Sequence, residues 1–325
     1  MIVFRTDASQ KTGFGHLTRS SYLASLLKNK SEVLFCVNKD KTVIRFLDER
    51  HCSYCFPKDL ERQSEPNYKS IIFDLRTFSD EDIRLLHQAK KYNRNTVQVT
   101  DMGLSQQDVD FTIDGSITRV FPYSEEKQNS LLTGPQYAIL HSHFRHFNKI
   151  KRKYRQQIKK VFISFGGGAT YRHLRNIIDL LTRFHFEVKI APGFCLKKNS
   201  TKTLRRLYPG IRFVGETPSL ARSLFDADVA LISPGIAAYE AASVGTPALY
   251  FYYHEEQKAT ALAFEKEGTG LVISNIDDIK NMKLIDKMNE LPFEKRLEMG
   301  NKGKQLVDAR GVYRIIEFFE THSIL

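Results

Sequence analysis

The stretch KKVFISFGGGATYRHLRNIIDLLTRFHFEVKIAP, residues 159–192, decides how the chain is organised. It opens with a β-branched and aromatic run, which predicts a strand, and continues into three glycines. The next segment, TYRHLRNIIDLLTRF, has apolar residues at helical spacing, and FEVKIAP is again strand-like. A strand, a helix and a second strand in this order predict a parallel pair joined by a crossover helix.

The same alternation runs through the rest of the sequence. In the first half, strands are predicted for IVFR, EVLFCV, KSIIFDL, TVQVT and VDFTID, with amphipathic segments between several of them. In the second half, IRFV, DADVALIS and TPALYFY follow the stretch quoted above. The pattern predicts an α/β fold with two doubly wound, Rossmann-like domains, residues 1–146 and 147–325, that face each other across a cleft. Ligands of such sheets bind at the carboxyl ends of the strands.

Length, charge and cysteine content limit the class of protein. The 325 residues suit two domains, no window is apolar enough to span a membrane, and the start lacks a secretory signal, so we expect a cytoplasmic protein. Four cysteines in so long a chain do not form a disulfide framework. The formal charge of +12 favours anionic ligands such as phosphorylated small molecules, and it is compatible with peripheral contact with an acidic membrane surface.

The basic run NKIKRKYRQQIKK, residues 148–160, carries much of this charge. It has one aromatic residue and lies in no recognisable nucleic-acid module, so we expect a solvated linker or helix face and no nucleic-acid partner. No feature of the sequence indicates an oligomeric state.

A second informative stretch is RTDASQKTGFGHLTR, residues 5–19, which follows the first predicted strand. Gly13 and Gly15 flank Phe14, and we expect a helix to begin near Leu17. Glycines let a ligand approach the main chain closely, and the free N–H groups of a helix N-terminus suit a phosphate or a developing oxyanion. Arg19, one turn into this helix, is placed to reach the same anion.

Two other nucleotide-binding motifs fit the loop poorly. Gly13-x-Gly15-x-x-Thr18 lacks the third glycine of a dinucleotide fingerprint, and the second strand ends in Val37-Asn38 with no acidic residue for a ribose. The P-loop motif is absent from the sequence.

His16 is the candidate catalytic residue of this loop. A single histidine is more often structural, but this one follows two glycines at the start of a predicted helix. A neutral histidine within reach of a water or a sugar hydroxyl acts as a general base. Asp7, on the same loop, would orient the ring or, alternatively, cap a turn.

The second half contains two candidate anion sites. FISFGGGAT places Gly167 in a glycine run before a helix that Thr170 would cap. ALISPGIAAYEAASVGTP places Ser233 and Gly235 before a helix of small residues, whose N–H groups could contact a diphosphate. Glu240 lies about one turn further along, at a sensible distance for ribose hydroxyls. On spacing alone, an ordinary strand–helix turn explains this segment equally well.

These segments resemble a known enzyme family. RTDASQKTGFGHLTR followed by LASLL, with SPGIAAYEAASVGTPALYFYYHEEQKATA at residues 233–261, is similar to the UDP-sugar hydrolases of the pseudaminic acid pathway and their spore-coat SpsG-like relatives. LLTGPQYAILHSHFR, residues 131–145, resembles their segment between domains, so the likeness covers most of the chain. These proteins resemble the lipid-II-forming N-acetylglucosaminyltransferase, and the likeness therefore implies a GT-B fold.

The resemblance also implies an activity without metal or cofactor. Water would attack the anomeric carbon of a UDP-linked diacetamido-trideoxy sugar, with His16 as the base, and UDP would leave. Such a reaction serves nonulosonic acid or surface polysaccharide biosynthesis. The family's R-x-D-x(5)-G-x-G-H-x-x-R motif is matched in this chain by Arg5, Asp7, Gly13, Gly15, His16 and Arg19. On this resemblance we expect contacts to the substrate or its phosphates from Arg5, Gly13, Phe14 and Gly15.

The resemblance assigns further contacts to the UDP moiety. The glycine-loop N–H groups and Arg19 would neutralise the departing diphosphate, while Ser233 and Gly235 would hold phosphate. Glu240 and Gln257 would match the ribose and diphosphate contacts. Uracil would lie on backbone groups near Val214.

Two loops depart from the family pattern. Family members usually carry Asp, then His or Ser, then Tyr after the fourth strand, where this chain has Asp74-Leu75-Arg76. Their paired aspartates after the next strand are replaced by TDMG, residues 100–103. Both loops face the sugar in such a fold, so Asp74 remains a candidate substrate contact while the tyrosine's role is unfilled. The change leaves open a different sugar, including one with an acidic group, or an acceptor other than water.

Other functions therefore stay in consideration. A GT-B glycosyltransferase that uses the same UDP-sugar donor is the main alternative, and a nucleotide-sugar-binding protein without chemistry is a third. We expect no metal site. Cys52 and Cys55 have zinc-like spacing, but no second pair follows and the two side chains face opposite ways on a strand. The cluster of His141, His143 and His146 is better explained as polar surface.

Overall fold

The computed structural model describes residues 1–8, 14–100, 107–118, 130–166, 170–193, 196, 198–214, 219–276 and 281–325. These residues form two compact units. The first unit comprises Met1–Ile139 and Arg310–Leu325, and the second comprises Leu140–Ala309.

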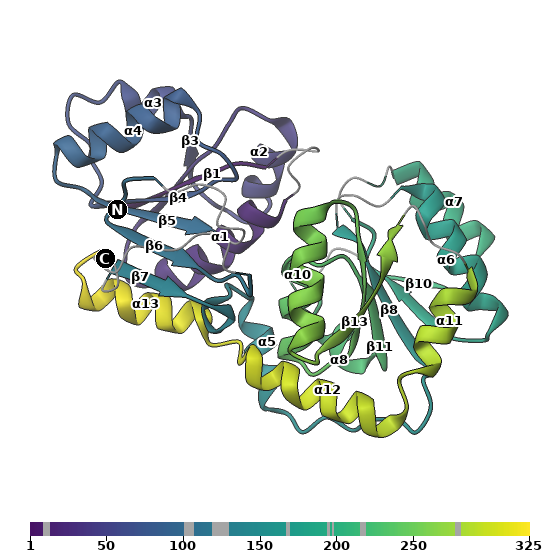
Figure 1. The fold of residues 1–325 in the computed structure, drawn as a ribbon. Coiled ribbons are helices and arrows are strands. Elements are labelled where there is room, and N and C mark those ends of the chain that lie inside the picture. The colour runs from purple at the N-terminus through teal and green to yellow at the C-terminus, as the bar shows by residue number, and fades with distance from the viewer. Residues whose placement is uncertain are drawn as a thin grey trace. The chain divides into compact units, whose positions relative to one another are not determined.

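The first unit is built on a parallel sheet with the strand order β3-β2-β1-β4-β5-β6-β7 (Figure 1). Its strands are β1 (Ile2–Thr6), β2 (Val33–Cys36), β3 (Tyr54–Cys55), β4 (Ser70–Asp74), β5 (Asn95–Thr100), β6 (Phe111–Asp114) and β7 (Leu131–Thr133). Its helices are α1 (Gly15–Leu27), α2 (Lys41–Asp48), α3 (Pro57–Glu61), α4 (Asp80–Lys91), the 3-10 helix η2 (Pro135–Tyr137) and α13 (Gly311–Thr321).

All five residues of β1 are buried because helices cover both faces of the sheet. Ile2 and Phe4 belong to the apolar cluster that includes residues of α1 and α13. Val3, which points the other way, belongs to the cluster with Leu60 of α3 and Leu85 of α4. The near-continuous apolar run that predicted this strand is therefore explained by burial on two sides.

The second unit has a parallel sheet with the order β10-β9-β8-β11-β12-β13. Its strands are β8 (Lys160–Ser164), β9 (Glu187–Ile190), β10 (Arg212–Phe213), β11 (Val229–Ile232), β12 (Ala248–Tyr252) and β13 (Gly270–Asn275). Its helices are α5 (Ser142–Lys149), α6 (Tyr171–Arg183), α7 (Lys198–Leu207), α8 (Ala221–Asp226), α9 (Ile236–Ser243), α10 (Glu255–Lys266), α11 (Asn281–Asn289) and α12 (Phe293–Leu306). Residues 159–192 contain β8, α6 and β9, and the two strands pair in parallel as predicted.

Two doubly wound α/β units are thus confirmed. In each sheet the strand order reverses next to the first strand, between β1 and β4 in the first unit and between β8 and β11 in the second. At such a switch point the connecting segments diverge to opposite sides of the sheet and leave room for a ligand at the carboxyl edge.

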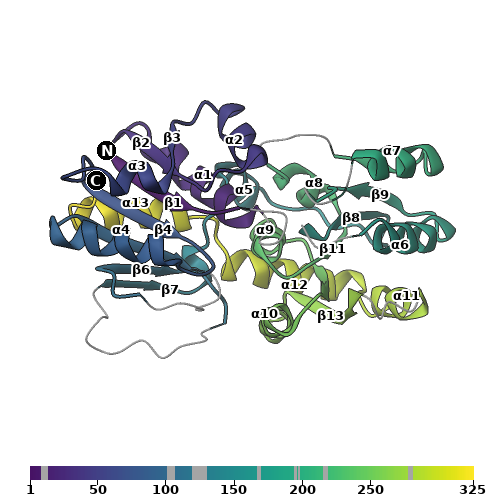
Figure 2. The same cartoon turned by 90° about the horizontal axis from the view of Figure 1, so that it is seen from above.

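The units are divided differently from the predicted 1–146 and 147–325. The second unit already begins at Leu140, and α5 packs on α8 and α9, with Asn148 Nδ2 donating to the Ser243 carbonyl at 2.8 Å. The chain also returns to the first unit at Arg310. There Ile315 and Phe319 of α13 are fully buried in the same apolar cluster as α1, and α13 lies beside the first unit in both views (Figures 1 and 2).

Most of the basic run at residues 148–160 is exposed, as expected for a solvated segment, but several of its side chains also bind the second unit. Arg152 donates to the Ala227 carbonyl and to Thr246 Oγ1, the latter at 2.5 Å. Tyr154 donates to the Gly245 carbonyl at 2.8 Å, and Arg155 Nη1 lies 2.9 Å from Asp228 Oδ1. Part of the charge of this run therefore ties the segment to its own unit.

Two glycines lie inside α12 because its neighbours approach it closely. A Cβ at Gly300 would lie 1.7 Å from the hydroxyl of Tyr154, and one at Gly303 would lie 2.9 Å from the carbonyl of Ala242. Helices α12 and α13 are separate, and Ala309, which lies between them, has φ 55°.

Candidate functional site

A cluster of polar side chains gathers at the switch point of the first unit. Asp74 ends β4 and pairs in register with Thr6, the last residue of β1. The helix that follows β1 begins beside this position, and His16 of its first turn places Nδ1 2.7 Å from Asp74 Oδ1.

Two further residues of α1 hold the same carboxylate. Arg19 donates from Nε at 3.0 and 2.9 Å to the two oxygens of Asp74 and from Nη2 at 2.5 Å to Oδ1. Ser20 donates from Oγ to Oδ2 at 2.8 Å. His16, Arg19 and Ser20 occupy positions i, i+3 and i+4, which lie on one face of a helix.

The surroundings of Asp74 fix its charge. Its side chain is 1% exposed, and burial alone would raise its pKa. The charge of Arg19, the charge that His16 carries when it is protonated, and the hydrogen bonds from both outweigh burial and lower the pKa of Asp74 to about 2. The carboxylate is therefore ionised at neutral pH.

An ionised carboxylate determines which ring nitrogen of His16 bears the proton. Asp74 can only accept, so Nδ1 donates to it, and Nε2 keeps its lone pair. Arg19 Nη2 also lies 3.0 Å from Nδ1, but a guanidinium only donates, and the 2.7 Å contact with the carboxylate is the shorter one. The imidazole is 13% exposed, and it can take up a proton at Nε2.

The carboxylate beside His16 is not the one expected from the sequence. Asp7 is half-buried, and no hydrogen bond joins it to His16 among the residues described. Asp74 takes the orienting position because the parallel pairing of β1 and β4 brings it to the start of α1.

Arg5 does not lie where a phosphate ligand would reach it. Its side chain is 2% exposed, with Nε 2.5 Å from Asp82 Oδ1 and Nη2 donating to Asn38 Oδ1 at 3.0 Å. Nη1 donates to the carbonyls of Thr6 and Cys36 at 3.1 and 3.4 Å. Arg5 thus links the ends of β1 and β2 to the start of α4 and is structural.

Phe14 and Gly15, at the end of the first loop, differ in burial. Phe14 is 6% exposed and packs on Phe46 with ring centroids 6.1 Å apart, so it anchors the start of α1 instead of lining a ligand site. Gly15 is exposed, and a Cβ added there would meet no atom within 4 Å, so its main chain is open to approach. Gly13 lies outside the described residues, as does Gly167 in the second unit.

The switch point of the second unit also carries predicted site residues. Ser233 follows β11 and is 7% exposed, and a Cβ added at Gly166, after β8, would lie 3.6 Å from its hydroxyl. Gly235 is exposed and precedes α9, which has no side-chain cap. The N–H of Ala238 already donates to the Gly235 carbonyl at 3.0 Å. The other N–H groups of a first helical turn have no carbonyl partner within the helix, so this end is able to bind an anion.

Glu240 is a buried carboxyl group on α9. It is 5% exposed, and its side chain has no hydrogen-bond or ion-pair partner among the described residues. Burial raises its pKa to about 8. A buried polar group without a partner costs stability, which is typical of a group that meets its partner in a ligand.

Two other residues that were predicted to contact the ligand already make hydrogen bonds within the protein. Gln257, in the first turn of α10, accepts from the Tyr253 N–H at 3.0 Å through Oε1, which leaves its amide NH₂ as the donor. The N–H of Val214 donates to the Ile190 carbonyl at 2.8 Å. A base near Val214 would therefore use groups other than this N–H.

Comparison with known proteins identifies relatives of this chain. No model of a known protein family matches it. It is 24% identical to the spore coat polysaccharide biosynthesis protein SpsG of Bacillus subtilis over 337 residues, covering 95% of this chain and 94% of that protein. The chain is a homologue of SpsG. It is also 25% identical to the uncharacterized protein MJ1062 of Methanocaldococcus jannaschii over 279 residues, covering 79% of this chain and 56% of that protein.

Solved structures with a similar fold include glycosyltransferases. MurG of Acinetobacter baumannii superposes with a TM-score of 0.69 at 12% identity, over 98% of this chain and 99% of that one. The spinosyn rhamnosyltransferase SpnG, complexed with thymidine diphosphate, gives a TM-score of 0.66 at 12% identity, over 98% and 100%. The SpsG homologue therefore has the GT-B fold, as the sequence resemblance implied.

The sequence reasoning missed Ser20 and the role of Asp74. Ser20 follows His16 by one helical turn, so helical spacing alone could have identified it. Asp74 is 58 residues from His16, and only the strand order brings the two together.

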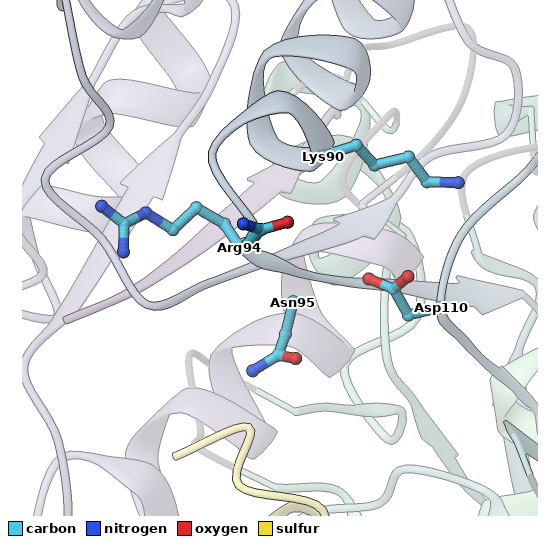
Figure 3. A pocket seen from close by; sticks show the side chains of 5 residues that line it. Lys90, Arg94, Asn95 and Asp110 are labelled. Carbon is cyan, nitrogen blue, oxygen red and sulfur yellow. The ribbon is translucent and has the colours of Figure 1, made fainter.

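A second hollow of the first unit lies away from this cluster. A cavity of about 370 Å³ is lined by Lys90, Asn93, Arg94, Asn95 and Asp110. Asn95 begins β5 and Asp110 precedes β6, so this cavity is at the amino edge of the sheet, away from His16. Lys90 and Arg94 point away from each other in Figure 3.

Within the described residues, no group of three or more His, Cys, Asp or Glu is placed to hold a metal. None of the described helices is long and apolar enough to cross a membrane.

Proposed function

We propose that this SpsG homologue is a hydrolase that releases UDP from a UDP-linked acetamido- or diacetamido-deoxy sugar. The homology supports a role in polysaccharide biosynthesis, of which nonulosonic acid formation is one route, and the GT-B fold supports a nucleotide-sugar substrate. The observation that carries the proposal is the His16–Asp74 contact, since it prepares Nε2 to accept a proton.

The reaction would proceed by attack of water on the anomeric carbon. His16 Nε2 takes a proton from the water as its oxygen bonds to that carbon, and the bond from the carbon to the diphosphate oxygen breaks. UDP leaves with the electron pair. Asp74 stays ionised and stabilises the imidazolium that forms, as an aspartate does beside a catalytic histidine.

The leaving diphosphate needs positive partners. Arg19 is held by Asp74, so we assign it to positioning instead of direct phosphate binding. The open main chain at Gly15, together with Ser233 and the N-terminus of α9, would bind the phosphates. Glu240 would pair with ribose hydroxyls, which supplies the missing partner of its carboxyl group.

The test is release of UDP from a panel of UDP-amino sugars with no acceptor added. We expect wild-type turnover on at least one sugar and a loss of about 10³-fold in His16→Ala, the usual size of a general-base contribution. His143→Ala, at an exposed histidine of α5, is the matched control and should keep full activity.

Other outcomes would identify the alternatives. UDP release that begins only when an alcohol acceptor is added would overturn hydrolysis in favour of a glycosyltransferase. Binding of an intact UDP-sugar by both proteins, without turnover under either condition, would indicate a binding role without chemistry.

A further inference from the structure

Two cysteine side chains lie opposite each other at the edge of the first sheet. Cys36 ends β2 and Cys55 ends β3, and the two residues are register partners in this parallel pair. Neighbouring strands lie about 4.8 Å apart. That separation is within the range of about 4.4–6.8 Å between the Cα atoms of a disulfide.

Both thiols lie on the same face of the sheet. Cys36 belongs to the apolar cluster with Leu60 and Leu85, and Cys55 packs against that cluster. Cys52 packs against the cluster on the other face, with Phe4 and Leu17. The sheet therefore separates Cys52 from the pair, as the alternation of strand side chains predicts.

The two thiols differ in access and acidity. Cys36 is fully buried, whereas Cys55 is half-buried. A hydrogen bond between the thiols lowers the pKa of Cys55, and the same bond, followed by burial, raises the pKa of Cys36. Cys55 is consequently the accessible thiol with the greater thiolate character, and thiolate is the reactive form.

We propose that Cys36 and Cys55 are a reversible dithiol–disulfide pair that reacts with low-molecular-weight disulfides such as oxidised glutathione. The Cys55 thiolate attacks one sulfur of oxidised glutathione, forms a mixed disulfide and releases one reduced glutathione. The Cys36 sulfur then attacks Cys55 Sγ, releases the second glutathione and gives up its proton to solvent. The two protein thiols are oxidised by two electrons, and oxidised glutathione is reduced to two molecules of the thiol.

A disulfide between Cys36 and Cys55 would join β3 covalently to β2 at an edge of the sheet. Strand β3 has two residues and pairs only with β2 among the described strands, so its attachment rests on few hydrogen bonds. Arg5 donates to the Cys36 carbonyl at 3.4 Å, which connects this edge to the frame around the end of β1. A disulfide at this place is expected to raise the midpoint of denaturant unfolding of the oxidised protein.

The experiment treats the folded wild-type protein with oxidised glutathione, blocks the remaining thiols after denaturation and maps the peptides by mass spectrometry. We expect the Cys36 and Cys55 peptides to be joined, with Cys52 alkylated. Reduction should restore four free thiols, the number of cysteines in the sequence. A stable glutathione adduct on Cys55 with Cys36 alkylated, a link that includes Cys52, or no reaction would each overturn the proposal.

Serine variants distinguish the thiol that attacks glutathione from the thiol that resolves the mixed disulfide. Cys36→Ser should accumulate glutathione on Cys55 because no thiol resolves the mixed disulfide, and Cys55→Ser should leave Cys36 unmodified. Cys52→Ser is the matched control and should form the same disulfide as wild type. The wild-type peptide map decides the proposal by itself if a serine variant fails to fold.

Discussion

The two sheets present carboxyl groups near equivalent switch points, yet treat them in opposite ways. Asp74 in the first unit is surrounded by His16, Arg19 and Ser20, which lower its pKa to about 2. Glu240 in the second unit has no side-chain partner among the described residues, and burial raises its pKa to about 8. The protein itself satisfies the first group, which suits positioning, whereas under the proposed function the second group would find its partner in the ligand.

The strongest test of this contrast is Asp74→Asn. The amide no longer neutralises Arg19 or stabilises an imidazolium, so we expect UDP release to fall by about 10²-fold or more. Combining it with His16→Ala should add little further loss, because the two residues act as a unit. Asp48→Asn, at an exposed site on α2, is the control. Additive losses in the double variant would separate Asp74 from His16.

The second test replaces the unpaired carboxyl group by Glu240→Gln and measures unfolding without ligand. The raised pKa means that folding favours the protonated acid. The stabilising contribution of this protonated group to the free energy of unfolding is therefore fully present below pH 4.5, its usual pKa, and is lost as the pH rises through about 8. We expect the glutamine variant to be the more stable by about 2 kcal/mol at alkaline pH, the usual cost of a buried unpaired polar group. Equal stability of the two proteins across this pH range would mean that Glu240 is paired.

The third test concerns nucleotide affinity. Glu240→Ala removes the group that would contact the ribose, and we expect UDP to bind about tenfold more weakly, the loss for about 1.4 kcal/mol of hydrogen bonding. Titration calorimetry measures this directly. Glu298→Ala, at an exposed position of α12, should bind UDP like wild type. Unchanged affinity in Glu240→Ala would place the ribose elsewhere.

The smallest expected effect belongs to Ser20→Ala. Removing the hydrogen bond from this hydroxyl to the Asp74 carboxylate leaves the contacts of Arg19 and His16 in place, so we expect only about a threefold fall in kcat/KM. Ser25→Ala on the same helix removes only a bond to the Tyr22 carbonyl and serves as the control. Restoration of activity by Ser20→Thr would assign the effect to the hydroxyl.

The sequence could predict the fold because its signals are local. Apolar runs bounded by glycines mark the strands, helical spacing marks α6, and the order of these elements is enough to predict parallel sheets. The candidate loops were found for the same reason, since a glycine next to a strand end can be read directly from the sequence. His16, Ser233 and Glu240 were all selected in this way.

Long-range pairing explains what the sequence could not supply. Arg5 and Arg19 belong to one motif and both were assigned to phosphate, but Arg5 is bound to Asp82, 77 residues away. Its inward direction depends on which strand flanks β1 and which helix covers it. The division at residue 146 failed to anticipate α13 in the first unit because helical periodicity does not tell which sheet a helix will cover.

The place of α13 has a consequence for synthesis on the ribosome. The residues that bury Ile315 and Phe319 are translated before the whole of the second unit, whereas α13 itself emerges last. The second unit is continuous from Leu140 to Ala309 and can begin to fold while the nascent first unit still has an uncovered apolar face. A stop codon that removes only α13 would therefore damage the half of the protein that was made first.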